Sequence, residues 1–217
     1  MSASAPDGSP VGLYAALGPL GEPEVIHGAV PAGSEILELG CGAGRITHEL
    51  IALGHPVTAV DNSADMLAHV RGAETVLADI ETLDLGRRFP VVLLASNFLN
   101  APDDEELDAV LAACARHVEP GGQVVLERMP PDWKARPGTS TTGGLEMTLR
   151  DVEHDGEVIS AVMDYRANGE RWTHEFRTRL IADEAVDAAL GRAGLELVRW
   201  LDERRSWLEA RPVRRGG

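Results

Sequence analysis

Residues 36–45 read Ile36-Leu37-Glu38-Leu39-Gly40-Cys41-Gly42-Ala43-Gly44-Arg45, and this stretch decides the fold. Its apolar start is typical of a buried strand, and the alternating glycines predict a tight turn that opens a helix. Glycine adopts positive φ easily and lets the backbone approach a ligand without a Cβ clash. Asp61, 17 residues past Gly44, stands where a ribose-binding carboxylate is expected. The stretch therefore predicts a nucleoside-like ligand at the carboxyl edge of a parallel sheet.

The spacing of the glycines separates two kinds of nucleoside site. A dinucleotide fingerprint has the form GxGxxG and needs a third glycine for close helix packing, but position 45 is Arg45. The pattern with Glu38 in front, ExGxGxG, resembles motif I of the class I S-adenosylmethionine-dependent methyltransferases. That resemblance implies a loop that wraps the methionine part of S-adenosylmethionine. Its recognisable motifs extend over residues 14–126, and the rest of the chain matches only in the order of elements.

Apolar runs alternate with helical patterns in the first part of the chain, which predicts an α/β, doubly wound, Rossmann-like sheet. The predicted strands occupy residues 35–39, 57–60, 75–78, 90–95 and 123–126, and the helices residues 43–53, 63–70 and 103–118. In the third helix, Asp103 and Glu106 have capping-box spacing. A helix over residues 183–193 and strands near 195–200 and 206–209 follow. The resemblance implies that they complete a seven-stranded sheet whose last strand is antiparallel.

The hydrophobic period changes after the fifth strand, which predicts an insertion. Prolines and glycines between residues 130 and 144 predict a flexible connection. Residues 145–152, 158–165 and 171–181 alternate as a three-stranded antiparallel β-meander, with hairpin signals at Asp155-Gly156 and Asn168-Gly169. This meander resembles the insertion of glycine N-methyltransferase-like and sugar N-methyltransferase-like enzymes, which covers the active site and often mediates dimerisation. The resemblance thus leaves a homodimer open.

We expect a single methyltransferase domain over residues 1–217. Within it we expect an N-terminal helical cap at residues 1–33 and a cofactor-binding core at residues 34–128. The antiparallel insertion is expected at residues 144–181, and the final helix and strands at residues 182–211.

The resemblance also implies which residues bind the cofactor. Asp61 would accept hydrogen bonds from both ribose hydroxyls, for which a carboxylate has enough acceptor sites. Asp79 would accept from the exocyclic amine of adenine. Arg45 would pair with the cofactor's carboxylate, or else lie in solvent as a first-turn residue. The full set implied by the resemblance is Tyr14, Glu38, Gly40, Cys41, Gly42, Arg45, Asp61, Asn62, Met66, Asp79, Ile80 and Ser96.

Two asparagines after the fourth strand are candidate substrate contacts. Asn97 and Asn100 are polar residues in an otherwise apolar segment, at the place where relatives face both the sulfonium and the substrate. Turn chemistry before Ala101-Pro102 explains Asn100 equally well.

The candidate general bases lie later in the chain. His174 shares the apolar face of the third inserted strand with Trp172, which we expect to contact the substrate, and with Phe176. An imidazole on that face could remove a proton near neutral pH; the alternative is a hydrogen-bonded histidine in a packed face. Glu127 is the second candidate, with an ion pair to Arg128 as its alternative.

Charge and cysteine content limit the partners. The formal net charge is −15, whereas nucleic-acid binding draws on clustered Lys and Arg. We therefore expect a small-molecule substrate and no nucleic acid. No apolar run reaches about 18 residues, so we expect no membrane span and a cytoplasmic location. Cys41 and Cys114 fit reduced thiols, and no Cys or His spacing suggests a metal.

Together these features predict methyl transfer from S-adenosylmethionine to an N, O or C nucleophile of a small molecule, with S-adenosylhomocysteine as product. The abundance of Ala, Gly and Arg suggests a GC-rich bacterial gene, and a role in specialised metabolism follows by analogy. One alternative is a methyltransferase-like cyclase or binding module that holds the cofactor. Another is an NAD-dependent oxidoreductase, against which Arg45 argues. Methylation of a protein is a weaker alternative.

Overall fold

The computed structural model describes residues 3–214 and contains two sheets. The larger sheet has seven strands in the order β10-β11-β5-β4-β1-β2-β3. Strands β1 to β5 pair in parallel, while β11 runs antiparallel to both β5 and β10. The predicted seven-stranded sheet with an antiparallel last strand is confirmed. The strands are β1 (Ile36–Leu39), β2 (Val57–Asp61), β3 (Glu74–Leu77), β4 (Phe89–Leu94), β5 (Val118–Glu127), β10 (Leu195–Trp200) and β11 (Trp207–Pro212).

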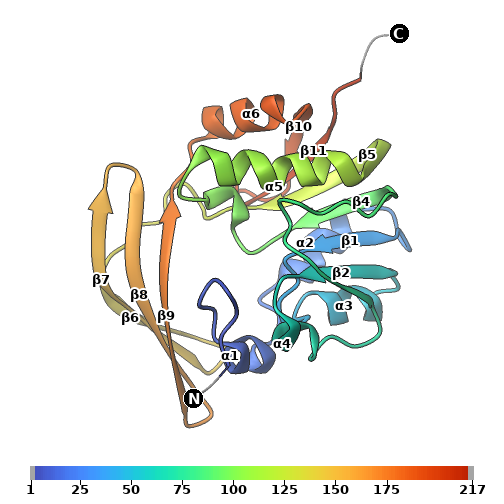
Figure 1. Cartoon of the computed structure of the whole chain (residues 1–217). Helices are drawn as coiled ribbons and strands as arrows, with labels where there is room; N and C mark the ends of the chain where they lie inside the picture. The colour runs from blue at the N-terminus through green and yellow to red at the C-terminus, as the bar shows by residue number, and fades with distance from the viewer. Residues whose placement is uncertain (1–2, 215–217) are drawn as a thin grey trace.

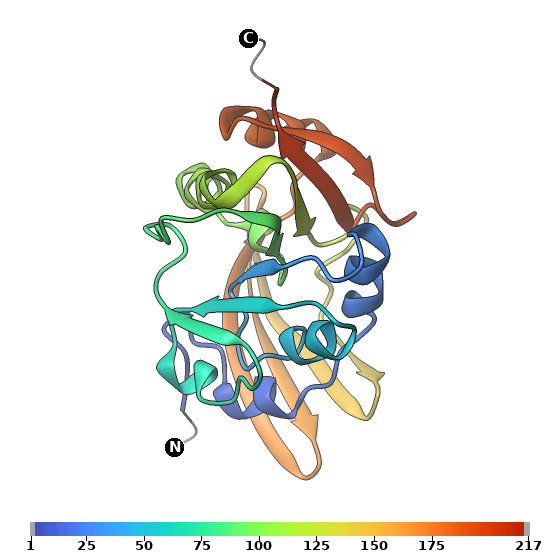
Figure 2. The ribbon, with the colours of Figure 1, turned by 90° about the vertical axis from the view of Figure 1, so that its right-hand side faces the viewer.

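Helices cover both faces of this sheet (Figures 1 and 2). They are α1 (Val11–Ala16), α2 (Glu22–Ala29), α3 (Thr47–Ala52), α4 (Ala64–Leu67), the 3-10 helix η1 (Phe98–Asn100), α5 (Asp104–His117) and α6 (Asp183–Arg192). As predicted, Asp103 caps α5, accepting the N–H of Glu106 at 2.9 Å. Two helices are shorter than predicted: α3 starts only at Thr47, after a loop with positive φ at Gly42 and Gly44, and α4 ends at Leu67.

The position of β4 in the sheet explains why residues 90–95, which were predicted to form a strand, are apolar throughout. Val92 and Leu94 pack into the core cluster on the α5 and α6 face of the sheet. Val91 and Leu93 pack into the opposite cluster, with α2 and α3. Successive side chains of a strand point to opposite faces, so a central strand covered on both sides needs apolar residues at every position.

The inserted sheet has four strands, one more than predicted, in the order β6-β7-β8-β9. They are β6 (Gly138–Thr142), β7 (Leu145–Asp155), β8 (Val158–Ala167) and β9 (Glu170–Arg179). The additional strand β6 lies in the segment predicted to be a flexible connection. Gly143 and Gly144 both have positive φ and join β6 to β7 by a two-residue turn, which is the geometry that Gly-Gly favours.

The inserted sheet stands to one side of the larger sheet, with α1 near its lower end (Figure 1). Leu13 of α1 packs with Leu145 and Trp172 of the inserted sheet in a small apolar cluster. Within residues 3–214, none of the helices combines the length and apolar character that crossing a membrane requires.

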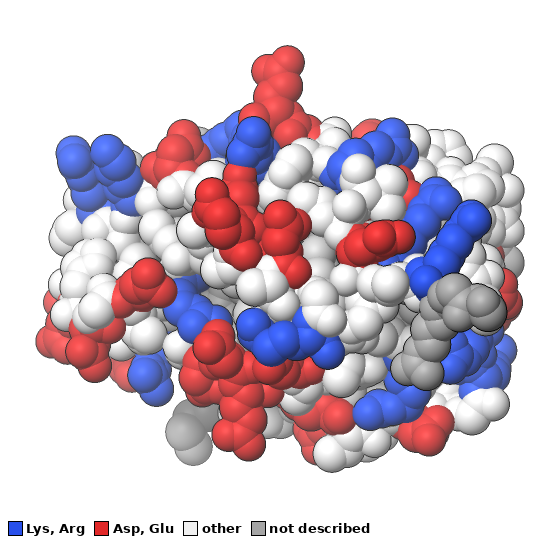
Figure 3. All heavy atoms as spheres, turned by 90° about the horizontal axis from the view of Figure 1, so that it is seen from above, with Lys and Arg blue, Asp and Glu red and all other residues white. Residues whose placement is uncertain are grey.

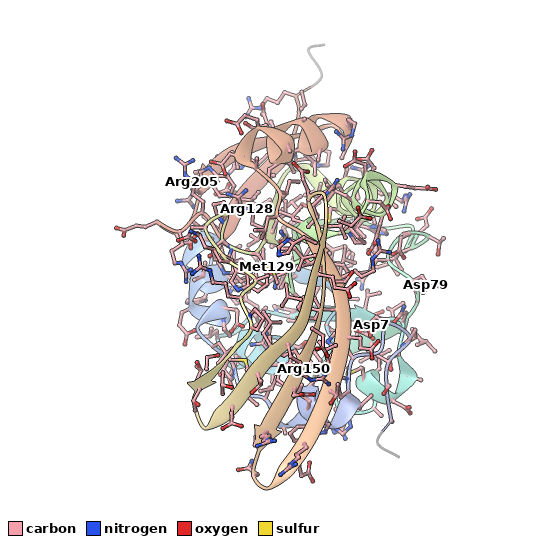
Figure 4. The ribbon with its side chains drawn as sticks, turned by 90° about the vertical axis from the view of Figure 1, so that its left-hand side faces the viewer. Asp7, Asp79, Arg128, Met129, Arg150 and Arg205 are labelled. Atoms are coloured by element: carbon pink, nitrogen blue, oxygen red, sulfur yellow. The ribbon has the colours of Figure 1, made fainter. Side chains whose placement is uncertain are left out.

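Arg128, directly after β5, anchors the chain where it returns from the insertion. Its side chain is 1% exposed, donates to the carbonyls of Arg205 and Ile181 at 2.8 Å each, and pairs with Asp183. Its guanidinium also stacks 4.3 Å from the ring centroid of Trp200. Figure 4 shows Arg128 and Arg205 together, away from the long hairpins. The pairing of Arg128 with Asp183 replaces the ion pair with Glu127 that the sequence left open.

Replacing Arg128 with Leu should lower the free energy of unfolding by about 2–4 kcal/mol, because two buried carbonyls and Asp183 lose a charged donor. Arg204 is a matched control, since it is exposed and its nearest carboxylate, Asp132, is 3.7 Å away. Arg204→Leu should change stability by no more than about 0.5 kcal/mol. Urea unfolding of both variants measures this, and equal losses would contradict the anchoring role.

Candidate functional site

A cavity of about 1150 Å³ lies between the carboxyl edge of the larger sheet and the inserted sheet. It exceeds the usual 300–1,000 Å³ of ligand pockets, so it has room for a cofactor and a second molecule. Most of the predicted site residues line it, and they come from distant segments of the chain. Those on the lining are Tyr14, Glu38, Gly40, Cys41, Gly42, Arg45, Asp61, Asn62, Met66, Ile80, Ser96, Asn97, Asn100 and His174. Asp79, Glu127 and Trp172 are not among the lining residues.

The loop after β1 has the conformation that its glycines predict. Gly40, Gly42 and Gly44 all have positive φ, at 73°, 55° and 85°. A Cβ on Gly40 would come within 2.5 Å of the Phe98 ring, whereas a Cβ on Gly42 would meet no atom within 4 Å. The loop is therefore tight against η1 at Gly40 and open to the cavity at Gly42.

The carboxylate of Asp61 joins this loop to the end of β2. One oxygen accepts the N–H of Gly42 at 2.7 Å and the other accepts the N–H of Ser63 at 2.9 Å. Burial raises the pKa of Asp61, while the two N–H donors act against that shift. Each carboxylate oxygen has a second acceptor site, so the group keeps its capacity for ligand hydroxyls. Ser63 caps α4 by accepting the N–H of Met66 at 3.2 Å.

Glu38 combines a cavity position with a structural contact. Glu38 is 2% exposed, and its carboxyl accepts the hydroxyl of Thr47 at 2.6 Å. Burial raises the pKa of Glu38 to about 7. The contact attaches α3 to the end of β1, and the sequence analysis did not single out Thr47.

Arg45 has a protein partner that the sequence analysis missed. Its guanidinium is 2.5 Å from the carboxylate of Glu22, and the two side chains are 15% and 10% exposed. Glu22 also accepts the N–H of Leu20 at 2.6 Å. Its position at the start of α2, after a left-handed Gly21, marks a helix start and gives no hint of Arg45. Pairing of Arg45 with the cofactor stays a prediction.

The residues predicted around adenine lie in two different settings. Ile80 and Met66 are buried and line the cavity. Asp79 is exposed, accepts from the side chain of Asn62 at 3.1 Å, and lies at the outer edge of the molecule in Figure 4. Asn62 thus connects the cavity lining to Asp79. Whether Asp79 contacts a ligand stays a prediction.

Two left-handed residues follow β4 and are held by Glu127. Ser96 and Asn97 both have φ of 62°, a conformation that costs of order 1–3 kcal/mol for such residues. The Glu127 carboxylate accepts the N–H of Ser96 at 2.6 Å. Burial raises the pKa of Glu127 to about 7, against the lowering effect of hydrogen bonds from Ser96 and Asn97. Glu127 therefore supports the loop that presents Asn97 and Phe98 to the cavity.

Asn100 connects both ends of the insertion. Its amide NH₂ donates to the carbonyl of Arg179 at 2.6 Å, and its amide oxygen accepts the N–H of Met129 at 2.6 Å. The side chain is 3% exposed. These backbone contacts occupy both ends of the amide, and the predicted substrate contact of Asn100 stays a prediction.

The two predicted residues of β9 face the interior but differ in surroundings. Trp172 is buried in the apolar cluster with Leu13 and Leu145. His174 lines the cavity, with its ring centroid 6.1 Å from that of Phe176. A Cβ on Gly8 would be 3.9 Å from the His174 ring, which places the N-terminal loop beside it.

The lining contains two sets of side chains, in which the predicted Tyr14, Glu38 and Asp61 stand beside residues that the sequence analysis did not assign to the site. The aromatic wall consists of Tyr14, Phe98, Trp133, Tyr165 and Phe176. The cavity carboxylates from the N-terminal loop and the larger sheet's domain are Asp7, Glu38, Asp61, Glu81 and Glu106. Asp151, Glu153 and Glu175 add exposed carboxylates from the inserted sheet. Their common position on the lining has no sequence signal, because Asp7, Trp133 and Phe176 lie far apart in the chain.

Comparison with known proteins gives the class of the fold. A family described as "Methyltransferase domain" matches residues 36–122. The chain is 31% identical over 144 residues to dTDP-3-amino-3,4,6-trideoxy-alpha-D-glucopyranose N,N-dimethyltransferase of Streptomyces venezuelae, covering 64% of this chain and 58% of that protein. It is 32% identical over 184 residues to dTDP-3-amino-3,6-dideoxy-alpha-D-glucopyranose N,N-dimethyltransferase of Streptomyces fradiae, covering 77% and 72%.

Solved structures agree with the sequence relatives. An amino pentose methyltransferase from Micromonospora echinaspora, solved with S-adenosylmethionine bound, has a TM-score of 0.69 and 25% identity, and the match covers 94% of this chain and 92% of that one. The chain therefore belongs to the S-adenosylmethionine-dependent methyltransferases of the class I, small-molecule type.

The raised pKa of Glu127 leads to a pH-dependent stability. Its ordinary value is 4.5 and its folded value about 7, so the folded chain retains a proton that the unfolded chain releases. The contribution of Glu127 to the free energy of unfolding is then largest below about pH 4.5, and it is lost as the pH rises through 7. The difference in unfolding free energy between Glu127→Gln and the unchanged protein should therefore shift in favour of the variant by about 1–3 kcal/mol from pH 5 to pH 8.

Urea unfolding at the two pH values measures this difference. Glu119→Gln is the control, because Glu119 lies on an exposed part of the same strand. The control should follow the pH dependence of the unchanged protein. An identical pH dependence for Glu127→Gln would contradict a buried carboxyl with a raised pKa.

Proposed function

We propose that this chain transfers the methyl group of S-adenosylmethionine to a nitrogen atom of a small-molecule amine, in bacterial specialised metabolism. Membership of the family supports the methyl transfer. The N,N-dimethyltransferases of amino sugars from two Streptomyces species support nitrogen as the acceptor atom. The observation that carries the proposal is the carboxylate of Asp61, held by the N–H groups of Gly42 and Ser63 beside the open face of the glycine loop.

The cofactor half of the cavity fits an adenosyl sulfonium compound. The open space at Gly42 would take the methionine part, and the free acceptor sites of Asp61 would take the ribose hydroxyls. Met66 and Ile80 offer apolar surface for a base. When bound, S-adenosylmethionine supplies a methyl group on positively charged sulfur. The surrounding carboxylates suit that charge.

The chain's own contribution to methyl transfer is positioning. The amine nitrogen must lie in line with the carbon–sulfur bond at near-attack distance, and a rigid cavity provides this orientation. The loop held by Glu127 and the face of β8 and β9 would lie on two sides of the acceptor. An ammonium must lose a proton first, and His174 is the candidate base on the cavity lining. Glu127 supports the loop after β4 by accepting the N–H of Ser96.

Asp61→Ala should weaken binding of S-adenosylhomocysteine about 10- to 100-fold, since it removes charged hydrogen bonds of about 1.5–3 kcal/mol. Asp65→Ala is a matched control, because Asp65 lies exposed on α4 and does not line the cavity. Titration calorimetry with S-adenosylhomocysteine and with NAD measures both variants and the unchanged protein. Tight NAD binding without binding of the adenosyl ligand would reject the proposed function.

A further inference from the structure

The side chains that line the cavity carry more negative than positive charge. Eight carboxylate residues line it, against only two arginines within residues 3–214. Asp151 is paired with Arg150, and Glu175 shares the outward face of β9 with Arg177. The remaining six are Asp7, Glu38, Asp61, Glu81, Glu106 and Glu153. Arg45 is already paired with Glu22. Arg177 alternates with Phe176 and Thr178 along β9 and is exposed, so its side chain points away from the inner face. Neither arginine offers an inward-facing, unpaired cation for an anionic ligand.

The start of α5 adds to this excess of negative charge. A helix N-terminus often binds phosphate, but here carboxylates occupy the cap and first turn, at Asp103, Asp104, Glu105 and Glu106. Burial raises the pKa of Glu106, and the carboxylates of Asp103 and Glu81 raise it further. Asp104 is paired with Arg179, and the other carboxylates of this turn repel an anion that approaches from this side.

Asp7 brings a carboxylate to the boundary between the two halves of the cavity. It raises the pKa of both Tyr14 and Asp61, after the larger effect of burial in each, which places it near both side chains. Its own hydrogen-bond partners are the N–H of Ser9 at 2.9 Å and the Ser9 hydroxyl at 2.8 Å. These are neutral groups, so the negative charge is not cancelled. In Figure 4 Asp7 lies beside β9.

The aromatic wall is an independent feature of the same cavity. The chain has only nine Trp, Tyr and Phe residues, and five of them line the cavity. Aromatic faces attract ammonium groups by about 0.5–2 kcal/mol and also pack against apolar or aromatic bodies. Carboxylates together with aromatic faces form a site that suits an organic cation.

The excess of carboxylates is not uniform over this protein, whose formal net charge is −15. On the face over α5 and α6, Lys and Arg alternate with Asp and Glu (Figure 3). The two Streptomyces relatives, by their names, act on sugars linked to a nucleoside diphosphate. A diphosphate is recognised by Arg, Lys or backbone N–H groups. Outside the cofactor half, the lining has carboxylates at Asp7, Glu81, Glu106 and Glu153, where such a ligand would need cations.

We propose that the methyl acceptor of this chain is an organic ammonium compound with an apolar or aromatic body and without a phosphate group. This inference rests on the proposed function and specifies its substrate class. The acceptor binds as the cation and loses one proton to His174 or to water. The nitrogen lone pair then forms the new N–C bond, while the electron pair of the broken S–C bond returns to sulfur, leaving a neutral thioether and an N-methylated ammonium.

A matched series of probes tests this substrate class. 2-Phenylethylamine, 2-phenylethanol and phenylacetate are similar in shape but are a cation, a neutral molecule and an anion at pH 7. Calorimetric titration into the protein loaded with S-adenosylhomocysteine should give affinities in that order, with a step of at least about threefold between amine and alcohol. Thymidine diphosphate should bind more weakly than the amine. Added salt should reduce the difference between amine and phenylacetate.

A pair of variants connects the preference to the cavity. Glu106→Gln should reduce the preference for the amine over the alcohol by about two- to fivefold. Glu105→Gln, one residue away in the same helical turn but outside the lining, should leave it unchanged. The proposal is overturned by equal affinities across the series, by absence of binding of all three, or by tighter binding of thymidine diphosphate. Loss of S-adenosylhomocysteine binding itself would instead reject the proposed function.

Discussion

The Asp61 carboxylate holds together the loop after β1 and the turn after β2. Parallel pairing aligns β1 with β2 but leaves the segments beyond their ends free to diverge. Asp61 accepts one N–H from each of these segments, Gly42 on one side and Ser63 on the other. A buried N–H without a partner is strongly disfavoured, so these bonds specify the path of both segments. The face of the glycine loop that opens to the cavity depends on this one side chain.

The second half of the cavity depends on how the inserted sheet is attached. Asn100 binds Met129, where the chain leaves the larger sheet, and Arg179, where β9 ends. Arg128 binds the carbonyls of Ile181 and Arg205 just beyond. Both ends of the insertion are therefore tied to buried polar groups of the larger domain. This attachment keeps Tyr165 and Phe176 of the inserted sheet on the cavity, opposite the carboxyl edge of the larger sheet.

Much of the fold was predictable because its signals are local. The parallel strands of the larger sheet were found from apolar runs that alternate with helical patterns, of which only the run at β4 is continuous, and α5 was found from its cap and its periodic apolar face. Strand β6 was missed because all five of its residues are exposed, so no alternation marks it. The Gly143-Gly144 turn and the threonines before it were its only signals. The glycine loop and Asp61 were found by spacing, whereas the backbone partners of Asn100 and the support that Glu127 gives to Ser96 were not.

The sequence by itself determined the alternation of strands and helices, the glycine loop with its positive φ, and the acidic residue at the end of β2. These follow from backbone preferences and periodicity within short segments. Only the tertiary structure decided that Arg45 pairs with Glu22, 23 residues away, and that Asn100 binds Arg179, 79 residues away. It alone also decided that carboxylates and aromatic rings from distant segments meet on the lining of one cavity. Ion pairing, burial and cavity charge depend on which distant segments pack against one another. No local sequence pattern encodes that packing.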